Sequence, residues 1–457
     1  MLEERSAEDS PAGEPTPKKI HPFFTKNAGG TGGKIGSFLW LDLLGKNKTC
    51  LHGKNSEPKC YPKVAAFDLD GTIIKSKGRS SSTGSNDWEW WHSTVPVKLQ
   101  EVAQQGYTIA IISNQAIKPA ALKQWKEKVV SMASRVQLTI NILNFAKLNP
   151  YQLKDVPFWI FAATAKDQYR KPMLGMWWEL EKIFEKRNVK IDLQSSFFVG
   201  DAAGRQYKNQ KSDFSSTDRK LALNIGISFM TPEEYFLKLP VHSNYVLPGF
   251  HVSMLQDCRS VNLYFSRTFS YHLVPAVTPT SSPIIPCSRN QEIILFCGYP
   301  ALGKTRFYTQ HFGPANYTHI NQDTLKTRDK CIKSAREALL RGESCVIDNT
   351  NRDIKTRKFY TNLAKEFQVP IRCFVFTGSI DLAWHNNLYR TFHRPPSRTN
   401  KAIRDLVPYS AFISFREQYE APTMDEGFAE IRQVNWKFGG TDEEKKNWSM
   451  WLQIDGK

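Results

Sequence analysis

The sequence predicts an α/β protein with two doubly wound domains. Apolar, β-branched runs alternate with helical stretches from about residue 38 to residue 236, and a second alternation begins at residue 292. Such alternation favours open, mainly parallel sheets with helices on both faces. Between the two patterns, residues 274–286 carry four prolines in thirteen positions, which excludes a helix or a central strand. We therefore expect a flexible tail over 1–37, a first domain over 38–273, a linker over 274–291 and a second domain over 292–457.

The expected elements follow from the length and composition of each run. In the first domain, four runs are short enough to be buried parallel strands, and two longer stretches have a helical pattern. The strands are Val64–Phe67, Tyr107–Ile112, Val156–Phe161 and Phe197–Val199, and the helices are Pro119–Ala133 and Met173–Arg187. In the second domain we expect strands at Glu292–Cys297, Ser344–Ile347 and Ile371–Phe376, with helices from Lys304 and over Lys355–Phe367.

Charge and cysteine content restrict the class of protein. The 457 residues include 62 Lys and Arg against 44 Asp and Glu, a formal net charge of +18. This balance suits a polyanionic partner such as nucleic acid, although a generally basic protein is the alternative. The eight cysteines form no Cys-x-x-Cys pair, which gives no support for structural zinc and favours a reducing, intracellular compartment. No run of about 18 apolar residues occurs, so we expect no membrane association.

A pair of carboxylates follows the first expected strand. Asp68 and Asp70 stand in the segment Asp-Leu-Asp-Gly-Thr, beyond the carboxyl end of Val64–Phe67, where open α/β sheets bind ligands. Asp68 can attack phosphorus as a nucleophile, and Asp70 can protonate the leaving oxygen and then activate water. A turn or a solvated face is the alternative for an isolated Asp-x-Asp.

An anionic nucleophile needs nearby positive charge to approach a phosphate. At about 4 Å and an effective dielectric near 20, one like-charge pair costs about 4 kcal/mol, which is about a thousandfold in rate. Three further groups follow apolar runs and can meet this need: the Ser113 hydroxyl, the Lys171 ammonium and the Asp201 carboxylate, the last as a ligand of Mg²⁺ together with Asp68 and Asp70.

These motifs resemble the phosphatases of the haloacid dehalogenase superfamily. Longer stretches, including Tyr169-Arg-Lys-Pro172 and Asp213-Phe-Ser215, narrow the resemblance to the eukaryotic polynucleotide kinase 3′-phosphatases. The resemblance implies that an aspartyl-phosphate forms on Asp68, that Asp70 is the general acid and base, and that Asp201 holds metal. It implies that Ser113 and Lys171 bind the phosphoryl group, whereas the downstream acids Asp213 and Asp218 have less defined roles.

The second domain begins with a phosphate-binding loop. Residues Gly298 to Thr305 satisfy Gly-x-x-x-x-Gly-Lys-Thr, with Gly303 and Lys304 in the expected places after an apolar strand. Backbone N–H groups in such a loop form an anion nest, while the lysine reaches the β- and γ-phosphates and the Thr305 hydroxyl helps to hold Mg²⁺. The sequence therefore predicts a site for ATP.

A kinase also needs a carboxylate beside the acceptor hydroxyl. In the kinase half of the same family the general base lies in Asn-Arg-Asp-Thr-Leu, so the resemblance assigns that role to Asp323, although Gln322 replaces the arginine. Asp348 follows an apolar run at a Walker-B-like place, and Arg390 lies on an expected lid. The animal enzymes carry an N-terminal forkhead-associated domain, which we do not expect in the short region before Val64.

Two weaker patterns involve aromatic residues. In the tail, Ile20, Phe23 and Phe24 have the i, i+3, i+4 spacing of a helical turn and resemble the peptide that binds the replication sliding clamp, proliferating-cell nuclear antigen. Docking of this segment on the chain's own phosphatase domain is the alternative. The tryptophans of Asn86-Asp-Trp-Glu-Trp-Trp91 could stack on bases of a 3′ end or could be core residues.

The resemblance as a whole implies a nuclear enzyme of DNA strand-break repair. It would remove 3′-phosphates and phosphorylate 5′-hydroxyl ends with ATP, acting on nicks, gaps or double-strand ends. Two alternatives stay open: repair of RNA ends by the same two activities, and a phosphatase whose kinase half only binds a nucleotide, for which Gln322 is the support.

Overall fold

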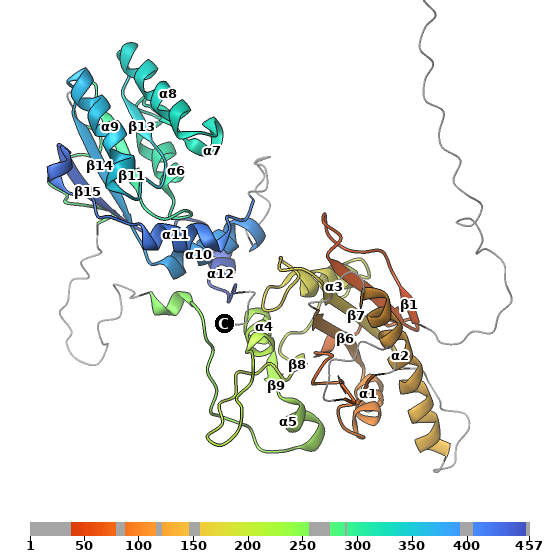
Figure 1. Ribbon diagram of the computed structural model, residues 1–457. Coiled ribbons are helices and arrows are strands. Elements are labelled where there is room, and N and C mark those ends of the chain that lie inside the picture. Colours follow the sequence, from red (N-terminus) through yellow and green to blue (C-terminus); the bar gives the residue numbers. More distant parts are fainter. Residues whose placement is uncertain are drawn as a thin grey trace, which may run out of the picture.

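A computed structural model describes residues 38–78, 87–115, 121–145, 156–255, 275–287, 290–393 and 405–453 of the chain. It contains two separate sheets, each flanked by helices (Figure 1). The expectation of two doubly wound α/β units is confirmed.

The first sheet has seven strands in the order β1-β2-β7-β6-β3-β8-β9. Its strands are β1 (Phe38–Trp40), β2 (Cys50–Asn55), β3 (Lys63–Phe67), β6 (Tyr107–Asn114), β7 (Phe158–Ala163), β8 (Phe197–Val199) and β9 (Ser228–Met230). The five strands from β7 to β9 are parallel, and the antiparallel pair β1-β2 extends one edge. A small ladder joins β4 (Ile74–Lys75) to β5 (Glu89–Trp90). Because β3 is central, residues that follow it reach the middle of the carboxyl edge.

Helices cover both faces of this sheet. They are α1 (Val95–Gln104), α2 (Leu122–Phe145), α3 (Gly175–Glu185), α4 (Thr217–Ile225) and α5 (Pro232–Leu237), with a 3-10 turn at Val252–Met254. Alternate residues of β3 point to opposite faces, as the strand period requires. Ala65 and Phe67 pack with residues of α1, α2 and α5, whereas Val64 and Ala66 pack with residues of α3 and α4. The sheet is therefore the middle layer of three.

The second sheet has six strands in the order β10-β15-β14-β11-β13-β12. They are β10 (Val277–Thr278), β11 (Ile293–Cys297), β12 (Thr318–Ile320), β13 (Cys345–Ile347), β14 (Ile371–Thr377) and β15 (Glu430–Asn435). All are parallel except β10, which pairs antiparallel with β15. The helices are α6 (Lys304–Phe307), α7 (Gln322–Leu325), α8 (Arg328–Leu340), α9 (Ile354–Phe367), α10 (Ile380–Leu388), α11 (Tyr409–Glu417) and α12 (Asp442–Trp448). Two π-helical turns extend α6 and α10, at Tyr308–Phe312 and Tyr389–His393, and a 3-10 turn lies at Met424–Glu426.

Two expected elements differ from the structure. The strand expected at Val156–Phe161 runs from Phe158 to Ala163 instead, because Pro157 has no N–H for the ladder. The expected linker 274–291 contributes the edge strand β10, and Arg432 donates to the carbonyls of Pro279 and Pro283 at 2.7 and 3.1 Å. Proline is tolerated at a sheet edge because the missing donor would face away from the ladder. Residues 275–287 thus pack on the second sheet.

Contacts also join the two α/β units. The region of α10 and α12 faces α4 of the first unit (Figure 1). The ring of Phe250 contacts that of His385 with centroids 5.1 Å apart, and Trp178 of α3 contacts His393 at 5.0 Å. In the described part of the chain, no helix combines the length and apolar composition needed to cross a membrane.

Candidate active sites

The first site forms at the carboxyl edge of the first sheet, around a buried lysine. Lys171 Nζ lies 2.5 Å from Asp68 Oδ1, 2.7 Å from Asp218 Oδ1 and 2.8 Å from the Ile112 carbonyl oxygen. Asp68 follows β3, and its backbone N–H donates to Val199 of β8, which fixes the carboxylate at the sheet edge. The loops after β3 and β7 and the start of α4 thus bring one cation and two carboxylates together.

A third carboxylate completes this cluster. Oxygen atoms of Asp68, Asp201 and Asp218 lie within 4.8 Å of one another. Burial raises the pKa of Asp68 to about 7, with Asp218 reinforcing the shift and Lys171 opposing it. Burial, followed by the charges of Asp68 and Asp218, raises the pKa of Asp201 to about 8. Burial acts to lower the pKa of Lys171, but the two carboxylates outweigh it and raise that pKa.

This donor set fits a divalent cation. Three carboxylates share one ammonium group, so ionisation of all three leaves excess negative charge, which adds to burial in raising the pKa values of Asp68 and Asp201. Hard ions such as Mg²⁺ prefer carboxylate oxygen ligands. Two glycines permit the crowding: a Cβ at Gly71, whose φ is +85°, would collide with the Asp201 carboxylate, and a Cβ at Gly200 would collide with that of Asp218.

Asp70 and Ser113 lie beside the cluster and are joined through a residue that the sequence did not single out. Gln115 Nε2 donates to Asp70 Oδ2 at 2.6 Å and to Ser113 Oγ at 2.9 Å, and Lys128 Nζ of α2 lies 3.4 Å from Asp70 Oδ1. The Asp70 side chain is exposed. It stands outside the group of three carboxylates, which Asp218 joins instead.

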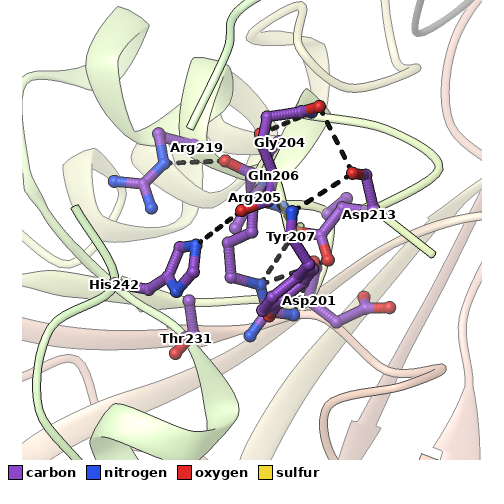
Figure 2. Close-up of polar contacts among 12 residues, drawn as sticks. Asp201, Gly204, Arg205, Gln206, Tyr207, Asp213, Arg219, Thr231 and His242 are labelled. Atoms are coloured by element: carbon purple, nitrogen blue, oxygen red, sulfur yellow. Dashed lines mark hydrogen bonds and ion pairs between the residues drawn. The ribbon is translucent and has the colours of Figure 1, made fainter. Parts of the chain in front are cut away.

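The two acids with undefined roles prove to be different. Asp218, at the first turn of α4, is fully buried in the cluster. Asp213 instead accepts from Arg205 Nε at 2.9 Å and from the backbone N–H groups of Ala203 and Arg205 at 3.3 and 3.0 Å (Figure 2). Arg205 also pairs with Glu233 at 2.7 Å. Asp213 therefore braces the loop that carries Asp201 and does not itself join the cluster.

The second site surrounds the loop between β11 and α6. Gly298 has φ +150°, and a Cβ there would lie 2.9 Å from Phe376 Cβ; Gly303, with φ +90°, caps α6. Lys304 Nζ donates to the carbonyl oxygens of Gly298 and Tyr299 at 3.0 and 2.6 Å. Burial lowers the pKa of Lys304 to about 8, although the negative charge of Asp348 acts to raise it. A bound polyphosphate would compensate the cost of burying this cation.

Asp348 organises the region after β13. Its Oδ2 accepts from Thr305 Oγ1 at 2.7 Å and from Asn321 Nδ2 at 3.1 Å, and His319 Nε2 lies 2.9 Å away. Burial acts to raise the pKa of Asp348, but the hydrogen bonds from His319 and Thr305 outweigh it and lower that pKa. A carboxylate beside the loop threonine fits the site of a nucleotide-bound Mg²⁺, for which Thr305 was expected to be one ligand.

The expected base and lid residues flank this loop. Asp323 is exposed on α7, where the Asn321 side chain accepts from its N–H at 2.7 Å and Gln322 N donates to Asn349 Oδ1 at 2.8 Å. Arg390, in the π-helical turn after α10, donates to Asn387 Oδ1 at 2.9 Å. Charges on Asp323 and Arg390 shift the pKa of Lys304 in opposite directions, so both residues lie near the loop.

The aromatic patterns have different outcomes. Trp88 is fully buried, and Trp90 and Trp91 pack against the same core cluster, which favours the structural interpretation of these tryptophans over base stacking. Ile20, Phe23 and Phe24 lie outside the described residues. Sequence reasoning missed Gln115, His319 and also Asn114, whose side chain bonds the backbone of Lys171. A single amide or imidazole carries no spacing signal.

Comparisons with known proteins cover both sites. A family model described as polynucleotide kinase 3 phosphatase matches residues 63–236, and an AAA domain model matches residues 326–407. The chain is 36% identical over 406 residues to the bifunctional polynucleotide phosphatase/kinase of Schizosaccharomyces pombe, covering 88% of this chain and 85% of the relative.

Two other relatives agree with this assignment. A protein of Acanthamoeba polyphaga mimivirus, provisionally given the same name, is 32% identical over 415 residues, covering 86% of this chain and 90% of the relative. The polynucleotide 3′-phosphatase ZDP of Arabidopsis thaliana is 34% identical over 187 residues, covering 38% of this chain and 24% of the relative. The similarity to the two bifunctional proteins spans both sheets and both sites, so the chain belongs to the family of bifunctional polynucleotide phosphatase/kinases.

Proposed function

We propose that the chain repairs DNA ends in the nucleus, removing 3′-phosphates at the first site and phosphorylating 5′-hydroxyls with ATP at the second. The observation that carries this proposal is that one chain holds both a buried Asp68–Lys171–Asp218 cluster and a loop with Lys304 and with Thr305 bonded to Asp348. We assign the phosphatase to residues 38–273 and the kinase to residues 292–457. Residues 275–287 pack at the edge of the kinase sheet.

In the phosphatase reaction, an Asp68 oxygen attacks phosphorus and the bond from phosphorus to the 3′-oxygen breaks. Asp70 gives its proton to that oxygen, and then accepts a proton from the water that hydrolyses the aspartyl-phosphate. Lys171 and Ser113 hold the phosphoryl oxygens. A Mg²⁺ held by Asp68 and Asp201, with Asp70 or Asp218 completing the ligands, would supply charge neutralisation when bound.

In the kinase reaction, the 5′-hydroxyl oxygen attacks the γ-phosphorus of ATP and ADP departs. Asp323 accepts the hydroxyl proton, Lys304 contacts the β- and γ-phosphates, and Arg390 meets the charge that develops during transfer. Thr305 and Asp348 are the residues that would hold a nucleotide-bound Mg²⁺.

A polynucleotide substrate is supported by the surface beside the phosphatase site. Phe214 is 77% exposed in the segment that follows the exposed residues Lys208 and Lys211. An aromatic ring flanked by cations suits a single-stranded end, because bases stack on the ring and phosphates pair with the lysines. Asp213, next to Phe214, connects this segment to the Asp201 loop through Arg205.

Two substitutions test the division of labour. Asp68→Asn should abolish phosphate release from a 3′-phosphorylated oligodeoxynucleotide and leave 5′-labelling intact, whereas Lys304→Ala should do the reverse. Substantial phosphate release by the Asp68 variant would refute the assignment of the nucleophile. Matched DNA and RNA ends, assayed in parallel, test the preference for DNA.

For the tail we propose binding to the replication sliding clamp through Ile20, Phe23 and Phe24, on their spacing alone. A chain with all three changed to alanine should lose clamp binding in calorimetry and keep both catalytic activities. Equal affinity of the wild-type chain and the triple-alanine variant for the clamp would refute the proposal.

A further inference from the structure

The kinase half ends in a segment that docks on the phosphatase half. Trp451 and Leu452, which follow α12, are 9% and 0% exposed. The Trp451 ring stacks on His251 with centroids 4.5 Å apart, and Lys220 Nζ of α4 lies 4.7 Å from that ring. Gln453 Nε2 donates to the Phe250 carbonyl at 2.9 Å. The segment therefore packs on both α4 and the loop around residue 250.

The other end of this segment is fixed to the kinase helices. Trp448, the last residue of α12, donates from Nε1 to Asn386 Oδ1 at 2.8 Å, and its carbonyl oxygen lies 2.6 Å from His385 Nε2. Both partners are on α10 and are buried. Only two residues separate this anchor at Trp448 from Trp451.

Asn224 connects the docked segment to the phosphatase site. Its Nδ2 donates to the Trp451 carbonyl at 2.8 Å and to the Pro172 carbonyl at 2.9 Å, while its Oδ1 accepts from the Trp451 N–H at 2.8 Å. These contacts use both donors of the amide and its acceptor. Aspartate, which has the same shape, lacks the donors, and alanine lacks all three contacts.

Pro172 follows directly on Lys171, which bridges the nucleophile Asp68 and Asp218. Asn114 holds the Lys171 backbone from the other side, accepting from its N–H at 2.8 Å and donating to its carbonyl at 3.1 Å. The same helix α4 carries Asp218 in its first turn and Asn224 near its end. The Lys171–Pro172 loop is therefore held from two sides. Asn114 of β6 bonds the Lys171 backbone, and Asn224 of α4 bonds both Pro172 and Trp451 of the kinase half.

We propose that Asn224 is a positioning residue that uses the docked segment Met450–Gln453 to hold the Lys171–Pro172 loop against Asp68. The inference rests on the proposed phosphatase function. Lys171 acts at the reacting phosphoryl group, so displacement of its loop should lower kcat. The KM for the oligonucleotide should stay unchanged, because the exposed surface around Phe214 binds the rest of the strand. Misplacement of a reacting group by about 1 Å can cost about a hundredfold in rate, so a loss of about tenfold or more is expected.

The test measures both activities of the intact chain on one oligonucleotide with a 3′-phosphate and a 5′-hydroxyl. Asn224→Ala and Asn224→Asp should lower the phosphatase kcat about tenfold or more, with KM within about twofold of wild type and kinase activity unchanged. Leu223→Ala is the matched control, because Leu223 is the neighbouring residue on α4 and is 54% exposed. It should retain both activities.

A second pair of variants removes the partner segment instead. A chain that stops after Ser449 should lose phosphatase kcat to the same extent as Asn224→Ala, whereas a chain that stops after Gln453 should match wild type. Hydrogen exchange at the Trp451 amide provides an independent readout, since Asn224→Ala removes its acceptor and should speed exchange.

Several results would overturn the inference. One is a phosphatase kcat equal to that of wild type in both Asn224 variants, and another is a wild-type kcat in the chain that stops after Ser449. The third is a parallel loss of phosphatase and kinase activities, which marks general unfolding. Failure of the proposed function is distinguishable, because wild-type protein would then release no phosphate from the 3′ end.

Discussion

Lys171 Nζ lies 2.5 Å from Asp68 Oδ1 although the two residues are separated by more than one hundred positions. Both side chains are almost completely buried. This pairing brings a positive charge to the oxygen that we propose attacks the phosphate, and it is the basis of the first prediction.

Lys171→Met should nearly abolish the phosphatase while sparing the kinase. Loss of one charge pair near 4 Å at an effective dielectric of about 20 removes about 4 kcal/mol, so we expect kcat to fall about a thousandfold. The measurement is release of inorganic phosphate, with 5′-labelling of the same preparation as the control for folding. A loss of less than tenfold would show that another cation serves the phosphoryl group.

Removal of a cluster carboxylate should abolish the thermal response to Mg²⁺. We expect Mg²⁺ at 100 times its Kd to stabilise the wild-type protein by about 2.7 kcal/mol. Asp201→Asn and Asp218→Asn should both lose this response. Asp201→Asn should also melt higher without metal, because it relieves repulsion among the three carboxylates, whereas Asp218→Asn removes an ion-pair partner of the buried Lys171. Asp70→Asn decides between the two candidates for the remaining ligand: a retained response assigns that place to Asp218, since the Asp70 side chain stands outside the cluster. If only the Asp70 variant loses the response, the metal lies elsewhere.

Asp323→Asn should separate nucleotide binding from phosphoryl transfer. General base catalysis contributes about 10²–10⁴-fold, so the kinase kcat should fall by that factor while calorimetric affinity for an ATP analogue is unchanged. Lys304→Ala should lose affinity as well. Absence of transfer in the wild-type chain, with ATP still bound, would instead favour a kinase half that only binds nucleotide.

Buried His385 should make the protein less stable in mild acid. Burial lowers the pKa of His385 to about 4. The hydrogen bond to the Trp448 carbonyl acts to raise this pKa, whereas the charge of His251 acts to lower it further. Between pH 6.5 and 4 the unfolded chain therefore binds a proton that the folded protein does not, so the free energy of unfolding decreases as pH falls. By pH 5 the loss is about 2 kcal/mol.

This prediction is checked by urea unfolding at pH 7.5 and pH 5, followed by tryptophan fluorescence. His385→Asn removes the titrating group, so the wild type should lose about 2 kcal/mol more than the variant between the two pH values. An equal loss in both proteins would assign the acid sensitivity to other groups, such as the buried His393.

The sequence by itself determined the two α/β units, the Asp68 carboxylate and the Lys171 ammonium at the sheet edge, and the loop from Gly298 to Thr305. These features are local: an apolar run predicts a buried strand, and a motif directly after it is carried to the sheet edge. The strand Ile293–Cys297 and the loop after it are predictable because both signals are local. The π-helical turn at Tyr308–Phe312 is not predictable in this way.

Only the tertiary structure decided which acids share the cluster and how the two halves meet. Asp213 and Asp218 are five positions apart in similar polar surroundings, yet one braces Arg205 and the other pairs with Lys171. Asn224 and Trp451 are separated by 227 positions and meet through two hydrogen bonds. Neither fact follows from periodicity or motif, because both depend on how α4 packs and on contacts between segments far apart in the chain.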